Sequence, residues 1–270
     1  MVIAIGMDVG YNRSMADPTY RSILITGASS GIGAAVAIEL AEPGVLIAMT
    51  GRNAERLQET ENACRHKGAE TMTGAIDVTD RAAMSAFVAD IEARRPLDLV
   101  FANAGISSSA GAGDGDDEKT RDVFAINLAG VLNTVLPALT AMRSRHAGQI
   151  AIVSSIAGFR GMPTAPAYSA SKVALRAWGE AIRPQLTRDG ISLSMIYPGF
   201  VESRITDAND FPMPFIMPAE KAAAIIVAGL ARRKKSIAFP WPMVLMMRLL
   251  TLLPGPLYNA VLARAPKKTT

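Results

Sequence analysis

The stretch Thr26-Gly27-Ala28-Ser29-Ser30-Gly31-Ile32-Gly33 decides the fold of this chain. The apolar run Ser22–Thr26 before it predicts a buried strand, and Gly31–Ala41 after it predicts a helix. Glycines at such a junction let the backbone turn tightly and approach an anion at the helix N-terminus, where N–H groups and the helix dipole favour negative charge. A glycine-rich turn can also be a plain turn, but the flanking strand and helix favour a pyrophosphate-binding loop.

The rest of the chain alternates short apolar runs with helical patterns and shows no internal repeat. Further strands are predicted at Val45–Thr50, Glu70–Ile76, Leu97–Ala102, Gln149–Ser154 and Ile191–Tyr197. Helices are predicted from Asn53 to Gly68, Thr79 to Ala93, Asp117 to Arg143, Pro166 to Arg188 and from about Ala219. Strands that are apolar on both faces, alternating with helices, indicate a parallel sheet covered on both sides. The predicted fold class is therefore α/β, a doubly wound, Rossmann-type parallel sheet in a single domain, with its ligand crevice at the carboxyl ends of the strands.

The composition limits the class of protein. Half of the 270 residues are apolar, and the net charge is only +4, with basic residues scattered except at Arg232–Lys235, so a nucleic-acid partner is not expected. Cys64 is the only cysteine, which excludes an intrachain disulfide and a CxxC metal site and is compatible with a reducing cytosol. The first 20 residues carry no signal-peptide pattern, so we expect a cytoplasmic protein. Residues 1–20 are interpreted as a flexible extension, or as an upstream extension of a chain that functionally starts near Met15.

Several motifs, in order, resemble the short-chain dehydrogenase/reductase family between about Arg21 and Lys235. The glycine stretch is similar to the family's TGxxxGxG cofactor loop, and Asp77-Val78 and Asn103-Ala104-Gly105 stand where the family holds the adenine and places its NAG element. Ser155 precedes Tyr168 by 13 residues, Tyr168-Ser169-Ala170-Ser171-Lys172 matches YxxxK, and Pro198-Gly199 resembles the family's PG turn. YxxxK alone is weak evidence, but the shared order and spacing of all these elements make coincidence a poor explanation.

The resemblance implies a set of catalytic residues. Tyr168 would be the general acid and base, Lys172 would also hold the nicotinamide ribose, Ser155 would bind the substrate oxygen, and Asn127 would anchor a water on the proton path. The 13-residue spacing selects Ser155 over its neighbour Ser154. Independently of the family, Tyr168 and Lys172 lie one helical turn apart, so we expect the lysine ammonium to lower the pKa of the tyrosine.

The end of the second strand indicates which cofactor is preferred. Thr50-Gly51-Arg52-Asn53 has no carboxylate to bind a ribose 2′-hydroxyl, and the guanidinium of Arg52 is suited to a 2′-phosphate. The sequence therefore predicts NADP(H) as the preferred cofactor. The alternative interpretation is that Arg52 is a solvated surface arginine with no role in cofactor binding. Some NADP-binding members of the family have a basic residue at the position of Ser30, so this serine does not help to choose between NAD(H) and NADP(H). The residues expected to hold the cofactor are Thr26, Gly27, Ser29, Ser30, Gly31, Ile32, Gly33, Arg52, Asp77, Val78, Asn103, Ala104, Gly105, Tyr168, Lys172, Pro198, Gly199, Val201 and Ser203.

Two apolar segments follow the motifs. The lid of the family over its substrate corresponds to about residues 203–218, where Arg204–Pro218 is rich in proline, methionine and phenylalanine; this favours a hydrophobic substrate, with a merely packed loop as the alternative. In the tail, residues 241–270, the apolar run Met243–Leu253 contains Arg248 and is too short to span a bilayer. We favour burial of this tail in a subunit interface or against the lid over contact with an anionic membrane surface.

The sequence thus predicts an NADP(H)-dependent oxidoreductase that interconverts a small-molecule carbonyl and alcohol. The resemblance implies a homodimer or homotetramer. A non-enzymatic NADP-binding sensor or scaffold on the same fold is the alternative from another class, and the intact serine, tyrosine and lysine argue against it. An epimerase or dehydratase using the same tyrosine is a second alternative. His66 and His146 have no ligand spacing around them, so no metal site is predicted.

Overall fold

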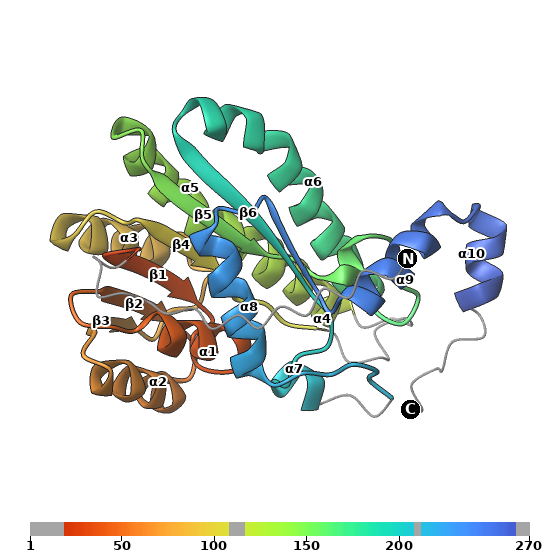
Figure 1. Cartoon of the computed structure of the whole chain (residues 1–270), viewed down its shortest axis with the longest axis horizontal. Coiled ribbons are helices and arrows are strands. Elements are labelled where there is room, and N and C mark those ends of the chain that lie inside the picture. The colour runs from red at the N-terminus through yellow and green to blue at the C-terminus, as the bar shows by residue number, and fades with distance from the viewer. Residues whose placement is uncertain (1–18, 108–116, 208–211, 263–270) are drawn as a thin grey trace, which may run out of the picture.

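A parallel β-sheet between two layers of helices forms the centre of the molecule (Figure 1). The computed structural model describes residues 19–107, 117–207 and 212–262. Within these residues the sheet has seven strands, in the order β3-β2-β1-β4-β5-β6-β7, and every neighbouring pair is parallel. The strands are β1 Ser22–Thr26, β2 Leu46–Thr50, β3 Glu70–Gly74, β4 Leu99–Ala102, β5 Gly148–Val153, β6 Ile191–Pro198 and β7 Ser236–Phe239. The predicted doubly wound parallel sheet is confirmed.

Helices connect the strands and cover both faces of the sheet. They are α1 Gly31–Leu40, α2 Ala54–His66, α3 Arg81–Arg94, α4 Asp117–Phe124, α5 Gly130–Ser144, α6 Pro166–Arg188, α7 Arg204–Asp207, α8 Ala219–Ala231, α9 Trp241–Leu252 and α10 Gly255–Leu262, together with the short turns η1 Ala125–Ala129 and η2 Ile156–Gly158. Asn53 caps α2 as predicted, because its side chain accepts a hydrogen bond from the backbone N–H of Arg56 at 2.8 Å.

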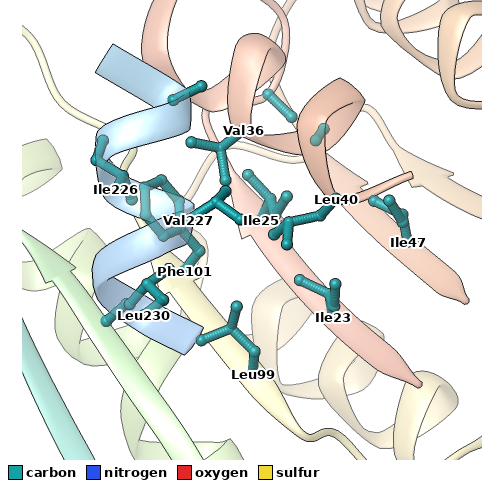
Figure 2. Close-up of a cluster of buried hydrophobic side chains, with 14 of the residues drawn as sticks. Ile23, Ile25, Val36, Leu40, Ile47, Leu99, Phe101, Ile226, Val227 and Leu230 are labelled. Atoms are coloured by element: carbon teal, nitrogen blue, oxygen red, sulfur yellow. The ribbon is translucent and has the colours of Figure 1, made fainter. Parts of the chain in front are cut away.

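One face of the sheet packs against α1 and α8 (Figure 2). Successive side chains of a strand point to opposite faces, so Ile23 and Ile25 of β1 join this core while Leu24 joins the other. From the helices, Val36 and Ile226 meet these strand residues and the fully buried Phe101 of β4. Burial on both faces explains why the central strands β1, β2 and β4 appear in the sequence as apolar runs, whereas the edge strand β3 is more polar and partly exposed.

The other face packs against α3, α5, α6 and the inner side of α9. The helical stretch from Asp117 to Ser144 is long and apolar enough by composition to cross a membrane, but Val135 and Leu139 of α5 are buried against the sheet. We therefore interpret this stretch as a core helix.

Three local features differ from the sequence-based expectation. Strand β7 was not predicted, because four residues after a basic run give little periodic signal. Strand β3 ends at Gly74 instead of Ile76, and β4 begins at Leu99 instead of Leu97. The predicted helix from Asp117 to Arg143 contains one π-helical turn, Ala125–Ala129. Most of the predicted N-terminal extension, residues 1–18, lies outside the described residues.

Candidate active site

The glycine loop after β1 needs glycine at three positions for different reasons. Gly27 and Gly31 have φ values of +67° and +55°, in the left-handed region that disfavours side chains. A Cβ at Gly31 would also lie 2.9 Å from Cβ of Ser203, and a Cβ at Gly33 would overlap the carbonyl oxygen of Gly27. Ser30, at the N-cap of α1, makes no side-chain hydrogen bond to the first turn. The loop therefore brings the N-terminus of α1 close to the cleft, with its N–H groups suited to an anion.

Hydrogen bonds join this loop to the end of β4. The Thr26 hydroxyl oxygen accepts from the backbone N–H of Asn103 at 3.1 Å and of Ala104 at 3.2 Å. In return, Nδ2 of Asn103 donates to the carbonyl oxygen of Thr26 at 3.0 Å. Thr26 and Asn103 thus fix the carboxyl ends of two neighbouring strands to each other.

A cleft of about 550 Å³ opens at the carboxyl edge of the sheet, above these strand ends. Its lining includes these residues of the predicted cofactor set: Gly27, Ser29, Ser30, Gly31, Ile32, Arg52, Asp77, Val78, Asn103, Ala104, Gly105 and Ser203. The other members of that set are not on its lining: Thr26, Gly33, Tyr168, Lys172, Pro198, Gly199 and Val201. The size of the cleft, its glycine-built wall and its helix N-terminus fit a dinucleotide.

Two arginines and one carboxylate lie at the far end of this cleft. Arg52 is exposed, whereas Nε of Arg56 is buried and has no hydrogen-bond partner within the described part of the chain. Desolvation raises the pKa of Asp77, but hydrogen bonds from Thr79 and the charge of Arg52 outweigh it and hold the pKa below its usual range. A buried, unpaired guanidinium N–H beside a second arginine makes this end of the cleft suited to an anion.

The catalytic candidates meet at the start of α6. The hydroxyl oxygen of Ser155 accepts from the backbone N–H of Ala157 at 3.1 Å, and the same hydroxyl donates to the carbonyl oxygen of Pro198 at 3.4 Å. The Ser155 side chain lies near enough to Tyr168 to lower the pKa of the tyrosine. Nζ of Lys172 lies 5.6 Å from the centre of the Tyr168 ring and donates to the carbonyl oxygen of Val153 at 2.9 Å. The neighbouring Ser154 instead donates to the backbone carbonyl of Lys172 at 2.9 Å. Of the two serines, Ser155 is therefore the one whose side chain influences the pKa of the tyrosine.

The protonation of this group differs from the sequence-based expectation. Burial raises the pKa of Tyr168, and the side chain of Ser155 only partly offsets that effect. Burial also lowers the pKa of Lys172 to about 8. The expectation that the tyrosine pKa is lowered on balance is wrong for this structure, because loss of hydration is the largest contribution to the pKa shift of both side chains.

Asn127 joins the end of β4 to α6. It lies in the π-helical turn and is fully buried. Its Oδ1 accepts from the backbone N–H of Ile106 at 2.8 Å, and its Nδ2 donates to the carbonyl of Ile106 at 2.8 Å and to the hydroxyl of Ser171 at 3.1 Å. A Cβ at Gly105 would lie 3.1 Å from Oδ1 of Asn127 and 3.5 Å from Nζ of Lys172. Gly105 therefore allows the cleft wall, the asparagine and the lysine to approach one another.

The turn after β6 lies beside the C-terminal helices. Gly199 donates its backbone N–H to the carbonyl of Phe239 at 2.7 Å, and a Cβ there would lie 3.0 Å from Sδ of Met243 in α9. Val201 pairs with Met217 in an isolated bridge. Of the predicted lid, residues 208–211 lie outside the described residues, and the rest exposes the apolar side chains of Ile205, Phe215 and Ile216.

Residues 21–211 match a family model described as short chain dehydrogenase. The chain belongs to the short-chain dehydrogenase family. It is 37% identical over 251 residues to an uncharacterized oxidoreductase of Myxococcus xanthus (strain DK1622), covering 93% of this chain and 99% of that protein. Two solved structures are similar to it in fold: a short chain dehydrogenase from Mycobacterium paratuberculosis bound to NAD and an actinorhodin polyketide ketoreductase variant with NADPH.

The Mycobacterium paratuberculosis structure has a TM-score of 0.71 at 26% identity, and the match covers 81% of this chain and 94% of that chain. The actinorhodin ketoreductase variant has a TM-score of 0.72 at 27% identity, and the match covers 83% of this chain and 97% of the ketoreductase chain. The chain is thus a short-chain dehydrogenase-family oxidoreductase, and a nicotinamide cofactor is supported because the two neighbours hold NAD and NADPH.

The short-chain dehydrogenase motifs did not identify every residue of the site. The cleft is also lined by Gly51, Asn53, Arg56, Ile76, Ile106, Ser107, Ile126, Arg204 and Ile205. Of these, Arg56 had a usable signal in the sequence, since it follows Arg52 by four residues just after the strand end that selects the cofactor. The apolar members had none, because they reach the cleft only through the packing of distant elements.

Proposed function

We propose that this chain is an NADP(H)-dependent oxidoreductase that interconverts a carbonyl and an alcohol, with Tyr168 as the general acid and base. The observation that supports this most is the arrangement of Ser155, Tyr168 and Lys172, which lie together at the junction of β5 and α6. A family member that only binds its cofactor has no need to keep all three side chains together at one place in the fold.

Proton transfer falls to the side chains of this chain. A bound nicotinamide would supply or accept the hydride. Tyr168 has a raised pKa and is protonated near pH 7, so it can donate its hydroxyl proton to the oxygen of the substrate as negative charge develops there. The Ser155 hydroxyl, which lies near enough to Tyr168 to lower its pKa, would hold that same oxygen.

Lys172 would act on the tyrosine through its charge. With a pKa of about 8 it carries a proton near pH 7, and its buried ammonium lies close to the tyrosine ring. Because the charge is poorly hydrated there, it would stabilise the phenolate that forms when Tyr168 gives up its proton. Asn127 would act by position, holding Ile106 against α6 through Ser171, and would anchor a water on the path from Lys172 to solvent.

The preference for NADP(H) is proposed from the two arginines. Arg52 and Arg56 line the cleft where no carboxylate follows β2, and the unpaired Nε of Arg56 would gain a charge-assisted hydrogen bond from a 2′-phosphate. The adenine would lie against Asp77 and Val78. The hydrophobic substrate is proposed from the exposed apolar side chains of the lid.

The test of the reaction begins with a panel of ketones, aldehydes and acyl-chain carbonyls, followed by loss of NADPH absorbance. On the best substrate, Tyr168→Phe should lower kcat by about 10²–10⁴-fold, because only the transferable proton is removed, while the Kd of NADPH stays nearly unchanged.

The adjacent serines provide a matched control pair. Ser155→Ala should also lower kcat strongly, whereas Ser154→Ala should mainly affect stability, since its hydroxyl binds only the backbone of α6. Wild-type turnover by Tyr168→Phe would refute the assignment. NADPH binding without turnover on any carbonyl would favour a sensor or scaffold.

The cofactor preference has its own test by calorimetry with NADPH and NADH. The wild type should bind NADPH more tightly, and Arg52→Ala and Arg56→Ala should each narrow the difference by about 1–3 kcal/mol through loss of a charge-assisted contact. Arg81→Ala, which removes an exposed arginine at the start of α3, serves as the control and should leave the difference intact. Equal affinities in the wild type would exclude the proposed preference.

A further inference from the structure

Helix α9 has one face against the body of the protein and one face in solvent. Met243, Val244 and Met247 are buried in the core on the second face of the sheet. On the other side, the exposed fractions are 74% for Trp241, 51% for Leu245, 56% for Leu249 and 78% for Leu252. These four residues stand at i, i+4, i+8 and i+11, so they form one stripe along the helix. We call Trp241, Leu245, Leu249 and Leu252 the outer face.

The orientation of the outer face is fixed by the rest of the molecule. Nη1 of Arg160 donates to the carbonyl oxygens of Leu250 at 3.0 Å and Leu253 at 2.7 Å, at the C-terminal end of α9. The Arg160 guanidinium lies 3.8 Å from the centre of the Tyr258 ring, and the Tyr258 hydroxyl donates to the carbonyl of Gly161 at 2.6 Å. Because these contacts anchor both helices to the domain, the exposed apolar stripe has a fixed position on the protein surface.

The sequence that contains the outer face has an unusual charge distribution. The 50 residues after Glu220 contain no aspartate or glutamate and nine basic residues: Lys221, Arg232, Arg233, Lys234, Lys235, Arg248, Arg264, Lys267 and Lys268. Of these, Arg248 lies on α9, Arg232–Lys235 lie at the far end of β7 from α9, and the last three lie outside the described residues. Arg248 stands at i+7 of the same stripe and is exposed. In Figure 1, α9 and α10 lie at the opposite end of the molecule from α2 and α3.

We propose that the outer face docks on an anionic lipid surface, with α9 lying in the plane of the interface. The apolar stripe would enter the boundary between headgroups and acyl chains, Trp241 has the amphipathic ring that favours this depth, and Arg248 would extend its guanidinium to the lipid phosphates. A helix of 12 residues cannot span a bilayer, so the contact is peripheral.

A second copy of the chain fits this face less well. A two-fold contact would place the same surface against itself and bring Arg248 toward its own copy. Neither α9 nor α10 contains a carboxylate that could pair with it. Anionic lipid, in contrast, complements both the apolar stripe and the positive charge.

The test uses the full chain and vesicles of two compositions, phosphatidylcholine alone and phosphatidylcholine with phosphatidylglycerol. The protein should sediment with the phosphatidylglycerol vesicles, and the emission of Trp241 should shift to shorter wavelength; in Trp241→Phe that shift should be absent. Raising the salt from about 0.1 M to about 1 M should release the protein, because the screening length falls from about 10 Å to about 3 Å.

Two exposed leucines offer a matched comparison. The double variant L245E/L249E should lower the vesicle partition coefficient by about tenfold or more, because two apolar contacts become charged. Leu136→Glu should leave it unchanged, since Leu136 is 50% exposed on α5, away from the outer face. Arg248→Gln is a milder second variant, which should lower binding to the anionic vesicles by about fivefold.

Three outcomes would overturn the proposal. The first is absence of sedimentation with phosphatidylglycerol vesicles, and the second is equal binding to both vesicle types. The third, measured by light scattering without lipid, is a smaller assembly for L245E/L249E than for the wild type, which would show that a second copy covers the outer face. Because the vesicle measurements involve no turnover, their result is independent of the proposed reaction.

Discussion

The cofactor cleft and the α9–α10 pair lie over opposite ends of the same sheet edge and are built in different ways. The cleft at the ends of β1 to β4 is shaped by backbone. Within the glycine loop itself, Gly27 and Gly31 have left-handed backbones and a Cβ at Gly33 would overlap the Gly27 carbonyl, although Gly31 also lies close to the distant Ser203. The α9–α10 pair is held by Arg160 and Tyr258, whose partners are 90 to 97 residues away in the sequence. A backbone constraint within a short loop leaves a recognisable motif in the sequence, whereas a contact between residues about 90 positions apart does not.

Adding one methyl group to the glycine loop should be enough to impair cofactor binding in the cleft. Gly31→Ala should weaken NADPH binding by about 10–100-fold, because the new Cβ would lie 2.9 Å from Ser203 and the residue has a left-handed backbone. Gly44→Ala is the matched control: φ is +83°, but nothing lies within 4 Å of its Cβ. It should cost about 1 kcal/mol of stability and leave NADPH affinity intact. Equal losses of affinity in the two variants would show that the close approach to Ser203 has no role in the cleft.

The same contrast explains how much could be predicted. Ser155, Tyr168, Lys172 and the glycine loop could be predicted because their motifs are short and have fixed spacing in the sequence. Arg160 and strand β7 were missed, since their roles depend on contacts that form only when the chain is folded. The sign of the Tyr168 pKa shift was also missed, because desolvation requires knowledge of burial that a four-residue spacing does not contain.

Lys172 lies on α6, between the two regions, and its charge should cost stability. Burial lowers its folded pKa to about 8 from 10.5, so the folded state binds a proton less readily than the unfolded state. The penalty is present in full below about pH 8 and fades as the pH rises toward 10.5. Lys172→Met should therefore raise the free energy of unfolding near pH 7 by on the order of 1–3 kcal/mol while turnover is lost.

Urea unfolding at about pH 7 and about pH 9.5 measures this effect. The gain in stability should be smaller at the higher pH, where the wild-type lysine is largely neutral in the folded state. Lys221→Met, on the surface helix α8, is the control and should show no such pH-dependent gain. A Lys172→Met protein that is less stable than the wild type by the same amount at both pH values would contradict the assigned cost of the buried charge.

The contacts that hold α9 and α10 should give the smallest effects, because each is one of several. Arg160→Lys keeps the positive charge but cannot bridge the carbonyls of Leu250 and Leu253 while stacking on Tyr258, so it should lower stability by about 1–2 kcal/mol. Tyr258→Phe keeps the ring and loses only the hydrogen bond to Gly161, at a cost of about 1 kcal/mol. Hydrogen exchange of the α9 and α10 amides should rise in both variants, and more in Arg160→Lys, while exchange in the glycine loop stays unchanged. If exchange rose equally in the glycine loop, the cofactor cleft and the α9–α10 pair would unfold as one cooperative unit. The two regions would then differ in the contacts that hold them but not in their local stability.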